Sequence, residues 1–247
     1  MECRLIFDPP ADGAWNMAMD EALRESVGRA GQGGCLRFYA WQVPTISLGY
    51  FQHHADRRAH EPSLDCPLVR RATGGGAILH DRELTYSYTT AVGTHVRSGL
   101  AHLYEVFHQG LIDELARHSL AARMCRNPVS RPREEEPFLC FQRRAERDVL
   151  LGDVKIAGSA QRRHRDTLLQ HGSVLLQRSA VAPELEGIEE LSSVKVDPRE
   201  LAEGWSRRVA SILGLMLRLD VPSAQELEAA QRFRQAQFTH ARWTERR

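Results

Sequence analysis

Three consecutive glycines, Gly74–Gly76, constrain the fold of this chain more than any other feature. Glycine adopts positive φ without penalty and weakens the interior of helices and strands, so a triple glycine marks a turn. The turn follows the strand-like run Pro67–Arg70 and precedes Glu83–Thr90, in which apolar and polar residues alternate. We therefore expect a sheet here, with a turn of bare backbone between two of its strands.

Hydrophobic periodicity predicts the other elements. The expected helices are Ala14–Val27, Leu100–His118, one from Pro198 onward and Ala224–Gln237; the expected strands are Cys35–Trp41, Thr45–Tyr50, Thr167–Gln177 and a hairpin of Asp148–Leu151 and Val154–Ile156. The buried face of the helix from Pro198 is expected to carry Leu201, Trp205, Val209, Ile212 and Met216. We predict an α+β fold: a single domain, 1–247, around a largely antiparallel mixed sheet flanked by helices, with a helical C-terminal part at about 198–247.

Composition argues against several classes of protein. The 247 residues are 42% hydrophobic and 26% charged, as in an ordinary globular protein, and the formal net charge is +1. General nucleic-acid binders carry a strong basic excess instead. The N-terminus lacks the basic segment and apolar run of a signal peptide, and no stretch reaches the length of a membrane span. We therefore expect a cytoplasmic protein that binds neither nucleic acid nor membrane.

Cys140 differs from the other cysteines in its position. The five cysteines are Cys3, Cys35, Cys66, Cys125 and Cys140, scattered without the close pairs of a zinc site, and we expect no bound metal. Cys140 follows a proline-rich, charged loop, Arg126–Pro137, and precedes the predicted hairpin. Most cysteines are inert core residues. A thiol is nevertheless the natural nucleophile of a thioester relay, because it accepts an acyl group and leaves again when an amine attacks.

Lysine is almost absent from the chain, occurring only as Lys155 and Lys195 among many arginines. A chain with this bias keeps a lysine by chance, or where the chemistry needs a compact, titratable ammonium. Lys155 lies between apolar residues and the small residues Gly158-Ser159-Ala160, which are expected to form a turn. Burial there would lower its pKa. The alternative is a strand lysine that reaches solvent.

The glycine turn and its flanks form the second candidate region. Bare backbone lets a ligand approach closely, so the amides of the turn can face an acyl carbonyl or a phosphate. The candidate binding residues are Arg71, Thr73, Gly74, Gly75, Gly76 and His80. A turn that is only flexible is the alternative interpretation.

The chain resembles the lipoate and octanoate protein ligase and transferase family, whose catalytic domain has the biotin/lipoyl protein ligase fold. The segments that carry the resemblance, in order, are Asn16–Leu23, Leu36–Trp41, Pro44–Gln52, Arg70–Asp81 and Lys155–Gln161. Ligases of this family activate free lipoate with ATP, whereas octanoyltransferases take octanoate from acyl carrier protein through a cysteine thioester. Cys140 ahead of Lys155, and Leu84-Thr85 where ligases typically carry Gly-Asn, are similar to the transferase branch. The sequence also lacks the extra C-terminal domain of many ligases.

The resemblance implies a mechanism and its partners. Cys140 would attack octanoyl-acyl carrier protein, while Lys155 and nearby backbone amides would stabilise the carbonyl oxygen. A lysine of a lipoyl-domain protein or of the glycine cleavage H protein would then accept the octanoyl or lipoyl group. Neither a cofactor, ATP nor a metal is implied. The residues implied to line the acyl site are Arg71, Thr73, Gly74, Gly75, Gly76, His80, Gly158, Ser159 and Ala160.

Two alternatives to a transferase remain at this point: an ATP-dependent lipoate-protein ligase, and a non-catalytic lipoyl- or acyl-binding module. Two features near the site are also open. His171, on a predicted strand, either approaches the site or packs in the core. The run Arg162–Arg165 either docks an acidic carrier protein or is solvated.

Overall fold

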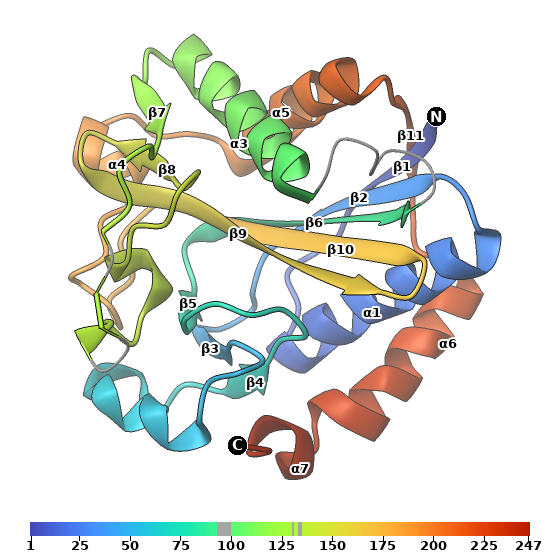
Figure 1. Ribbon diagram of the computed structural model, residues 1–247, viewed down its shortest axis with the longest axis horizontal. Coiled ribbons are helices and arrows are strands. Elements are labelled where there is room, and N and C mark those ends of the chain that lie inside the picture. The colour runs from blue at the N-terminus through green and yellow to red at the C-terminus, as the bar shows by residue number, and fades with distance from the viewer. Residues whose placement is uncertain (93–99, 130, 133–134) are drawn as a thin grey trace.

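An eight-stranded sheet forms the centre of the computed structural model, which describes residues 1–92, 100–129, 131–132 and 135–247. The strand order is β11-β1-β2-β6-β10-β9-β8-β7 (Figure 1). The strands are β1 (Glu2–Phe7), β2 (Gly34–Tyr39), β6 (Glu83–Ala91), β7 (Ala122–Met124), β8 (Val149–Leu151), β9 (Val154–His164), β10 (Thr167–Leu175) and β11 (Met216–Asp220). Strand β1 pairs in parallel with β2 and β11, and the other neighbouring pairs are antiparallel. The predicted α+β fold with a largely antiparallel mixed sheet is confirmed.

Helices cover both faces of this sheet (Figure 1). Helices α3 (Leu100–Arg117) and α5 (Pro198–Leu213) lie on one face, and α1 (Gly13–Ala30) and α6 (Ala224–Phe233) on the other; α4 (Ile188–Ser192) and α7 (Ala241–Thr244) are short. On the first face the ring of Tyr86 in β6 stacks on Phe107 at 4.9 Å and meets Trp205 edge-on at 4.7 Å. Buried aromatic contacts of this kind fix the two helices on the sheet. No helix in the described ranges is long and apolar enough to cross a membrane.

A second, smaller sheet carries the glycine turn. It consists of β4 (Leu68–Arg70), β3 (Thr45–Leu48) and β5 (Ile78–His80), with β3 in the middle. The turn Gly74–Gly76 joins the two outer strands and therefore crosses the end of β3. A Cβ atom on Gly49, directly after β3, would lie 2.0 Å from the carbonyl oxygen of Gly75. Glycine at position 49 is thus required by the close approach of two backbones.

The C-terminal part differs from its predicted all-helical structure. Helix α5 buries Leu201, Trp205 and Val209 as expected, but it ends at Leu213, and Gly214 follows with a φ of 63°. A left-handed glycine is the usual end of a helix. Met216, expected on the same helical face, instead begins the edge strand β11 and is 63% exposed. Ile212, at 49% exposure, is not part of the buried face either.

Most of the other predicted elements agree with the structure to within a few residues, but β9 extends to His164 instead of ending at Ile156, and β1, β5, β7 and α4 were not predicted. Helix α1 starts where the Asp12 carboxylate accepts a hydrogen bond from the Trp15 amide at 2.9 Å, and ends at Gly31 with a φ of 66°. These caps satisfy backbone groups that a helix end leaves free. In the expected loop Arg126–Pro137, residues 130, 133 and 134 lie outside the described residues.

Candidate active site

The backbone of Cys140 is hydrogen-bonded to the residue that follows the glycine turn. Its amide donates to the carbonyl of Ala77 at 2.7 Å, and the Ala77 amide donates to the carbonyl of Phe138 at 3.1 Å. Ala77 and Leu139 thus form a short parallel bridge between two segments far apart in the sequence. Cys140 begins a single turn of 3-10 helix, Cys140–Gln142, and is half-buried. The thiol is therefore held at a fixed place beside the glycine turn.

Lys155, on β9, approaches the same thiol. Its Nζ atom donates to Cys140 Sγ at 3.6 Å and to the Cys140 carbonyl at 3.4 Å. Nζ also forms an ion pair with Asp148 Oδ2 at 2.9 Å, and both side chains are less than a tenth exposed. Lys155 is thus a buried, paired cation in contact with a sulfur atom. The alternative that it reaches solvent is wrong.

The direction of the Lys155 pKa shift was predicted incorrectly. Burial acts to lower this pKa, but the negative charges of the Cys140 thiolate and of Asp148 act in the opposite direction, and the pKa is raised overall. A close opposite charge favours the charged form of a group even where water is excluded. Lys155 therefore remains an ammonium ion at neutral pH.

The small residues after Lys155 are part of a strand rather than the expected turn. Gly158, Ser159 and Ala160 all belong to β9, which is paired with β10 along this stretch. A Cβ atom on Gly158 would lie 2.7 Å from Lys155 Cε and 3.0 Å from Asp148 Oδ1. Glycine at this position therefore makes room for the ion pair.

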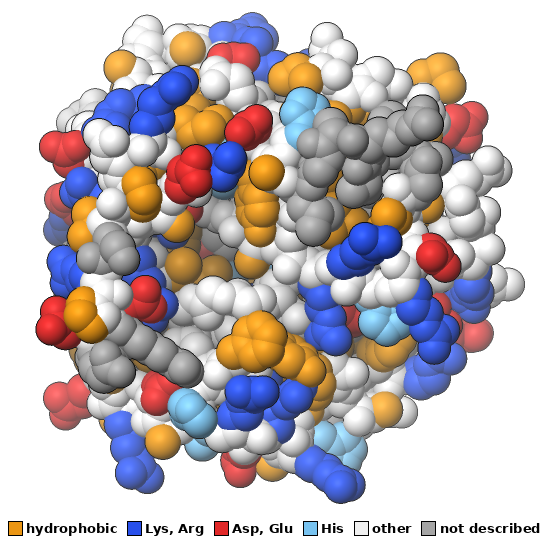
Figure 2. Space-filling model, in the orientation of Figure 1, with side chains coloured by type: hydrophobic (Ala, Val, Ile, Leu, Met, Phe, Trp, Pro, Cys, Tyr) orange, Lys and Arg blue, Asp and Glu red, His pale blue; other side chains and the backbone are white. Residues whose placement is uncertain are grey.

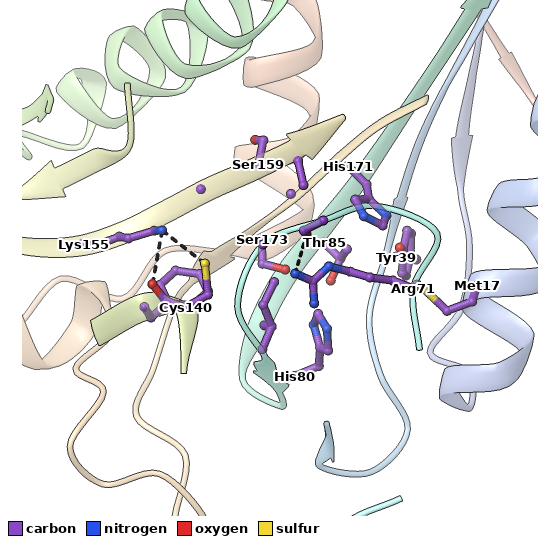
Figure 3. A pocket seen from close by; sticks show the side chains of 17 residues that line it. Met17, Tyr39, Arg71, His80, Thr85, Cys140, Lys155, Ser159, His171 and Ser173 are labelled. Atoms are coloured by element: carbon purple, nitrogen blue, oxygen red, sulfur yellow. Dashed lines mark hydrogen bonds between the residues drawn. The ribbon is translucent and has the colours of Figure 1, made fainter. Parts of the chain in front are cut away.

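The Ser159 hydroxyl points toward α3, away from Cys140 (Figure 3). Its oxygen is 2.6 Å from Nε2 of the buried His108 and 2.8 Å from the Tyr86 hydroxyl. His108 Nδ1 is 2.5 Å from the carbonyl of Arg147, and because a carbonyl only accepts, Nδ1 carries the proton. Burial is the main cause that lowers the pKa of His108. A neutral His108 thus connects β9 to the residue that precedes Asp148.

Arg71 determines the shape of the glycine turn. Its Nη2 donates to the carbonyls of Gly74 and Gly76, both at 2.7 Å, and its Nη1 donates to the Ser47 carbonyl at 2.9 Å and hydroxyl at 3.1 Å. Burial lowers the pKa of Arg71 to about 10. Gly75 has a φ of 93°, a conformation that costs other residues energy. Most of the hydrogen bonds that the Arg71 guanidinium donates thus go to backbone carbonyls.

His80 lies behind the turn as a neutral ring. The Ser47 hydroxyl already accepts from Arg71, so its hydrogen is free for His80 Nε2 at 2.7 Å. His80 Nδ1 then donates to Glu83 Oε1 at 2.6 Å, and the ring stacks on Trp41 with 3.8 Å between centroids. Burial is the largest influence on the pKa of His80 and lowers it.

These groups surround one pocket (Figure 3). Of the predicted site residues it is lined by Arg71, Gly74, Gly75, His80, Cys140, Lys155, Gly158, Ser159 and Ala160. Cys140 and Lys155 lie at one end, while Met17 of α1 and Tyr39 of β2 lie at the opposite end. His171, left open by the sequence, also lines the pocket.

Two predicted residues, Thr73 and Gly76, support the wall from behind. The Thr73 hydroxyl is 2.5 Å from His171 Nε2, and a Cβ atom on Gly76 would lie 2.8 Å from the guanidinium carbon of Arg143. Sequence reasoning missed Asp148, whose Oδ2 also accepts from the Ala145 amide at 2.7 Å. An acidic residue at the start of the hairpin that carries Lys155 was the available signal. Within the described part of the chain, no cluster of three or more His, Cys, Asp or Glu residues is arranged to hold a metal ion.

Comparisons with known proteins place this chain in a family. Residues 12–226 match the lipoyl protein ligase A/B catalytic domain. Octanoyltransferase LipM of Kyrpidia tusciae is 30% identical over 99% of this chain and 98% of its own length, and that of Brevibacillus brevis is 30% identical over 99% of both.

Among solved structures, a bi-partite lipoate protein ligase with its E2 lipoyl domain from Thermoplasma acidophilum has a TM-score of 0.77 at 20% identity, over 99% of this chain and 96% of that chain. At this identity the likeness shows the fold alone. The domain match and the two full-length relatives together make this chain a member of the lipoyl protein ligase A/B catalytic domain family.

Proposed function

We propose that Cys140 carries an octanoyl group as a thioester between an acyl carrier protein and a lysine of a lipoyl-domain protein. The full-length relatives are octanoyltransferases, and octanoyl transfer in protein lipoylation is the activity of this chain. The observation that carries the proposed mechanism is the contact of the Lys155 ammonium with Cys140 Sγ at 3.6 Å. An adjacent cation stabilises a thiolate, which is the nucleophilic form of cysteine.

In the first half-reaction the Cys140 thiolate attacks the carbonyl carbon of the donor thioester. The carbonyl oxygen gains negative charge, and the Lys155 ammonium, held by Asp148, stabilises it. The tetrahedral intermediate expels the thiolate of the carrier arm, which takes a proton from water. Cys140 is then acylated, and we propose that the octanoyl chain extends along the pocket toward Met17.

In the second half-reaction the neutral amine of an acceptor lysine attacks the Cys140 thioester. The Cys140 thiolate leaves, and the amide nitrogen releases its proton to water. The released Cys140 sulfur again lies beside Lys155, and the site is ready for another donor. The pocket draws on residues from Met17 to Ser173, which supports the interpretation of 1–247 as one catalytic domain.

Intact-mass measurement tests this mechanism directly. After incubation with octanoyl-acyl carrier protein, the protein should gain one octanoyl group, and Cys140→Ser should gain none. Cys66→Ser, another half-buried cysteine, is the matched control and should be acylated normally. A lipoate ligase would instead require free acid, ATP and magnesium, and a binding module would form no adduct. Either result would refute the thioester mechanism.

A further inference from the structure

Three arginines beside the pocket have no acidic partner. Within the described ranges, Arg162, Arg246 and Arg247 form no ion pair, while some other arginines do, for example Arg37 with Asp8 and Arg4 with Asp220. The three guanidinium groups instead lie over aromatic rings. Arg162 and Arg246 are 4.9 Å and 4.1 Å from the ring centre of Tyr50, and Arg247 is 5.4 Å from that of Phe51. We call these five residues the rim cluster: Tyr50, Phe51, Arg162, Arg246 and Arg247.

The rim cluster borders the wall of the pocket. The Tyr50 amide donates to the Thr73 carbonyl at 2.8 Å, and Arg162 Nη1 donates to the Ala72 carbonyl at 2.9 Å. The Phe51 ring is 3.7 Å from the point where a Cβ atom on Gly74 would stand, and Gly74 lines the pocket. The cluster therefore lies directly beside the glycine turn that lines the pocket.

Positive charge and exposed apolar surface occur together at this rim. The hydrogen bond from Arg246 is the main cause that lowers the pKa of Tyr50, and the charges of Arg162 and Arg247 act in the same direction. Phe51 is 58% exposed. In Figure 2, basic and hydrophobic side chains gather beside a hollow, over the end of the β9–β10 hairpin and near the C-terminus. The net charge of the whole chain is only +1, so this charge is a local feature.

This composition is typical of a protein-binding surface. Aromatic and arginine side chains dominate the binding energy of many interfaces. Cations without an intramolecular carboxylate keep their charge available for a partner, and complementary charge speeds association. We propose that the rim cluster docks an acidic surface of the protein that delivers the acyl group. The proposal rests on the proposed function. It favours the donor over the acceptor because the rim cluster borders the glycine turn, along which the proposed function places the acyl chain, whereas the acceptor brings only an amine to Cys140.

Charge reversal at Arg246 tests the docking surface. Arg246 is exposed and does not line the pocket, whereas Arg162 also supports the Ala72 carbonyl and is a poorer choice. For Arg246→Glu, the carrier concentration giving half-maximal acylation of Cys140 should rise roughly tenfold at low salt, with the limiting rate little changed. Added salt should weaken the wild-type interaction more than that of the variant.

Arg199→Glu is the matched control. Arg199 also lies over an aromatic ring, 3.5 Å from the centre of Phe7, but it has its own partner, Glu203, and stands on α5, on the other side of the sheet. This variant should acylate like the wild type. An equal effect of both reversals would mean a general charge effect and would overturn the proposal.

An acyl donor without a carrier protein distinguishes failure of the docking proposal from failure of the thioester mechanism. The octanoyl thioester of N-acetylcysteamine has no protein surface, so Arg246→Glu should react with it at the wild-type rate. Failure of the wild-type protein to be acylated by either donor would refute the thioester mechanism rather than the docking surface. If Arg246→Glu slows only the transfer from Cys140 to a lipoyl domain, the rim cluster binds the acceptor, and the proposal is wrong.

Discussion

Cys140 and Lys155 at one end of the pocket are held in a different way from Arg71 and His80 in its wall. We call Cys140, Asp148 and Lys155 the charged end. There a buried ammonium is shared between one carboxylate, at 2.9 Å, and one sulfur, at 3.6 Å. In the proposed mechanism, the charge balance of this end changes whenever the sulfur gains or loses an acyl group.

The glycine wall, which we define as Arg71, Gly74, Gly75 and His80, has no such freedom. Arg71 donates four hydrogen bonds to Ser47 and to the turn, and His80 is neutral between two fixed partners. Buried hydrogen-bond networks rigidify a structure, and among the described residues of this one only Arg71 Nε and Glu83 Oε2 lack a partner. From this contrast we propose that the charged end performs the chemistry and that the glycine wall supplies a fixed surface for the acyl chain.

Among the changes that test this contrast, removal of the Cys140 thiol should have the largest effect on octanoyl transfer. Cys140→Ala should lower octanoyl transfer at least about 10³-fold while the fold persists, because no other group in the charged end can carry the acyl chain. Transfer assays and thermal unfolding should be measured together, with Cys66→Ser beside them. Substantial turnover in the folded variant would show that the charged end is not the reaction centre.

Replacement of Lys155 by arginine should have the second-largest effect on octanoyl transfer. Lys155→Arg keeps the charge, but a planar guanidinium does not fit a space bounded by Gly158 and Asp148, so transfer should fall roughly 10²-fold. Lys195→Arg, with an 81% exposed side chain, should behave like the wild type. Near-normal kinetics for Lys155→Arg would show that transfer requires only the positive charge at this position and not the shape of the lysine side chain.

Loss of the carboxylate tests whether the charged end depends on its pair. Asp148→Asn leaves a buried ammonium without its counter-ion, which should lower the free energy of unfolding by about 3 kcal/mol. Urea denaturation measures this change. Asp153→Asn, whose side chain is 79% exposed, should cost little. Equal stability of the two variants would contradict the assigned ion pair.

A side chain in the glycine wall should have a smaller effect on catalysis. In Gly75→Val the branched residue must adopt a φ near 93°, and its Cβ would lie 3.0 Å from Arg71 Nη2. Strain of this kind is on the order of 1–2 kcal/mol, so acylation of Cys140 should fall roughly tenfold. Alkylation of Cys140 by a small reagent should remain normal. Gly214→Val introduces similar strain far from the pocket and should transfer octanoyl at the normal rate.

Gly76→Val should act differently from Gly75→Val, although both glycines belong to the same turn. Position 76 has no positive φ, and its Cβ would displace Arg143 instead of entering the pocket. We therefore expect the effect on acylation to be smaller than that of Gly75→Val.

The smallest expected effect is that of His108 on how the free energy of unfolding depends on pH. His108 has a pKa below its ordinary value of 6.5, so the unfolded chain binds more protons than the folded one just below that pH. Its contribution to stability is complete above pH 6.5 and is lost as pH falls through the lowered pKa. His108→Gln should flatten this slope in urea denaturation series, whereas His240→Gln, at an exposed position, should not. An unchanged slope would mean that His108 does not titrate on unfolding.

Local signals were sufficient for much of the fold. The helical period of α1 and α3 and the glycine turn are properties of short segments, and their elements form nearly where expected. Strand β11 was missed because its partner β1 lies more than 200 residues away, and Met216 and Leu219 are exposed on an edge strand. An exposed edge strand has little periodic signal, because neither face is fully buried.

The sequence by itself predicted which residues bear the chemistry: a cysteine outside any metal pattern, a lysine in an arginine-rich chain, and a turn of bare glycine. Only the tertiary structure decided how they act together. The bulge near Val149 and Leu150 sets the register that brings Asp148 to Lys155, and the bridge between Ala77 and Leu139 brings Cys140 to the glycine turn. The pKa of Lys155 then follows from the competition between burial and nearby charge, which depends on distances of a few ångströms that sequence spacing does not encode.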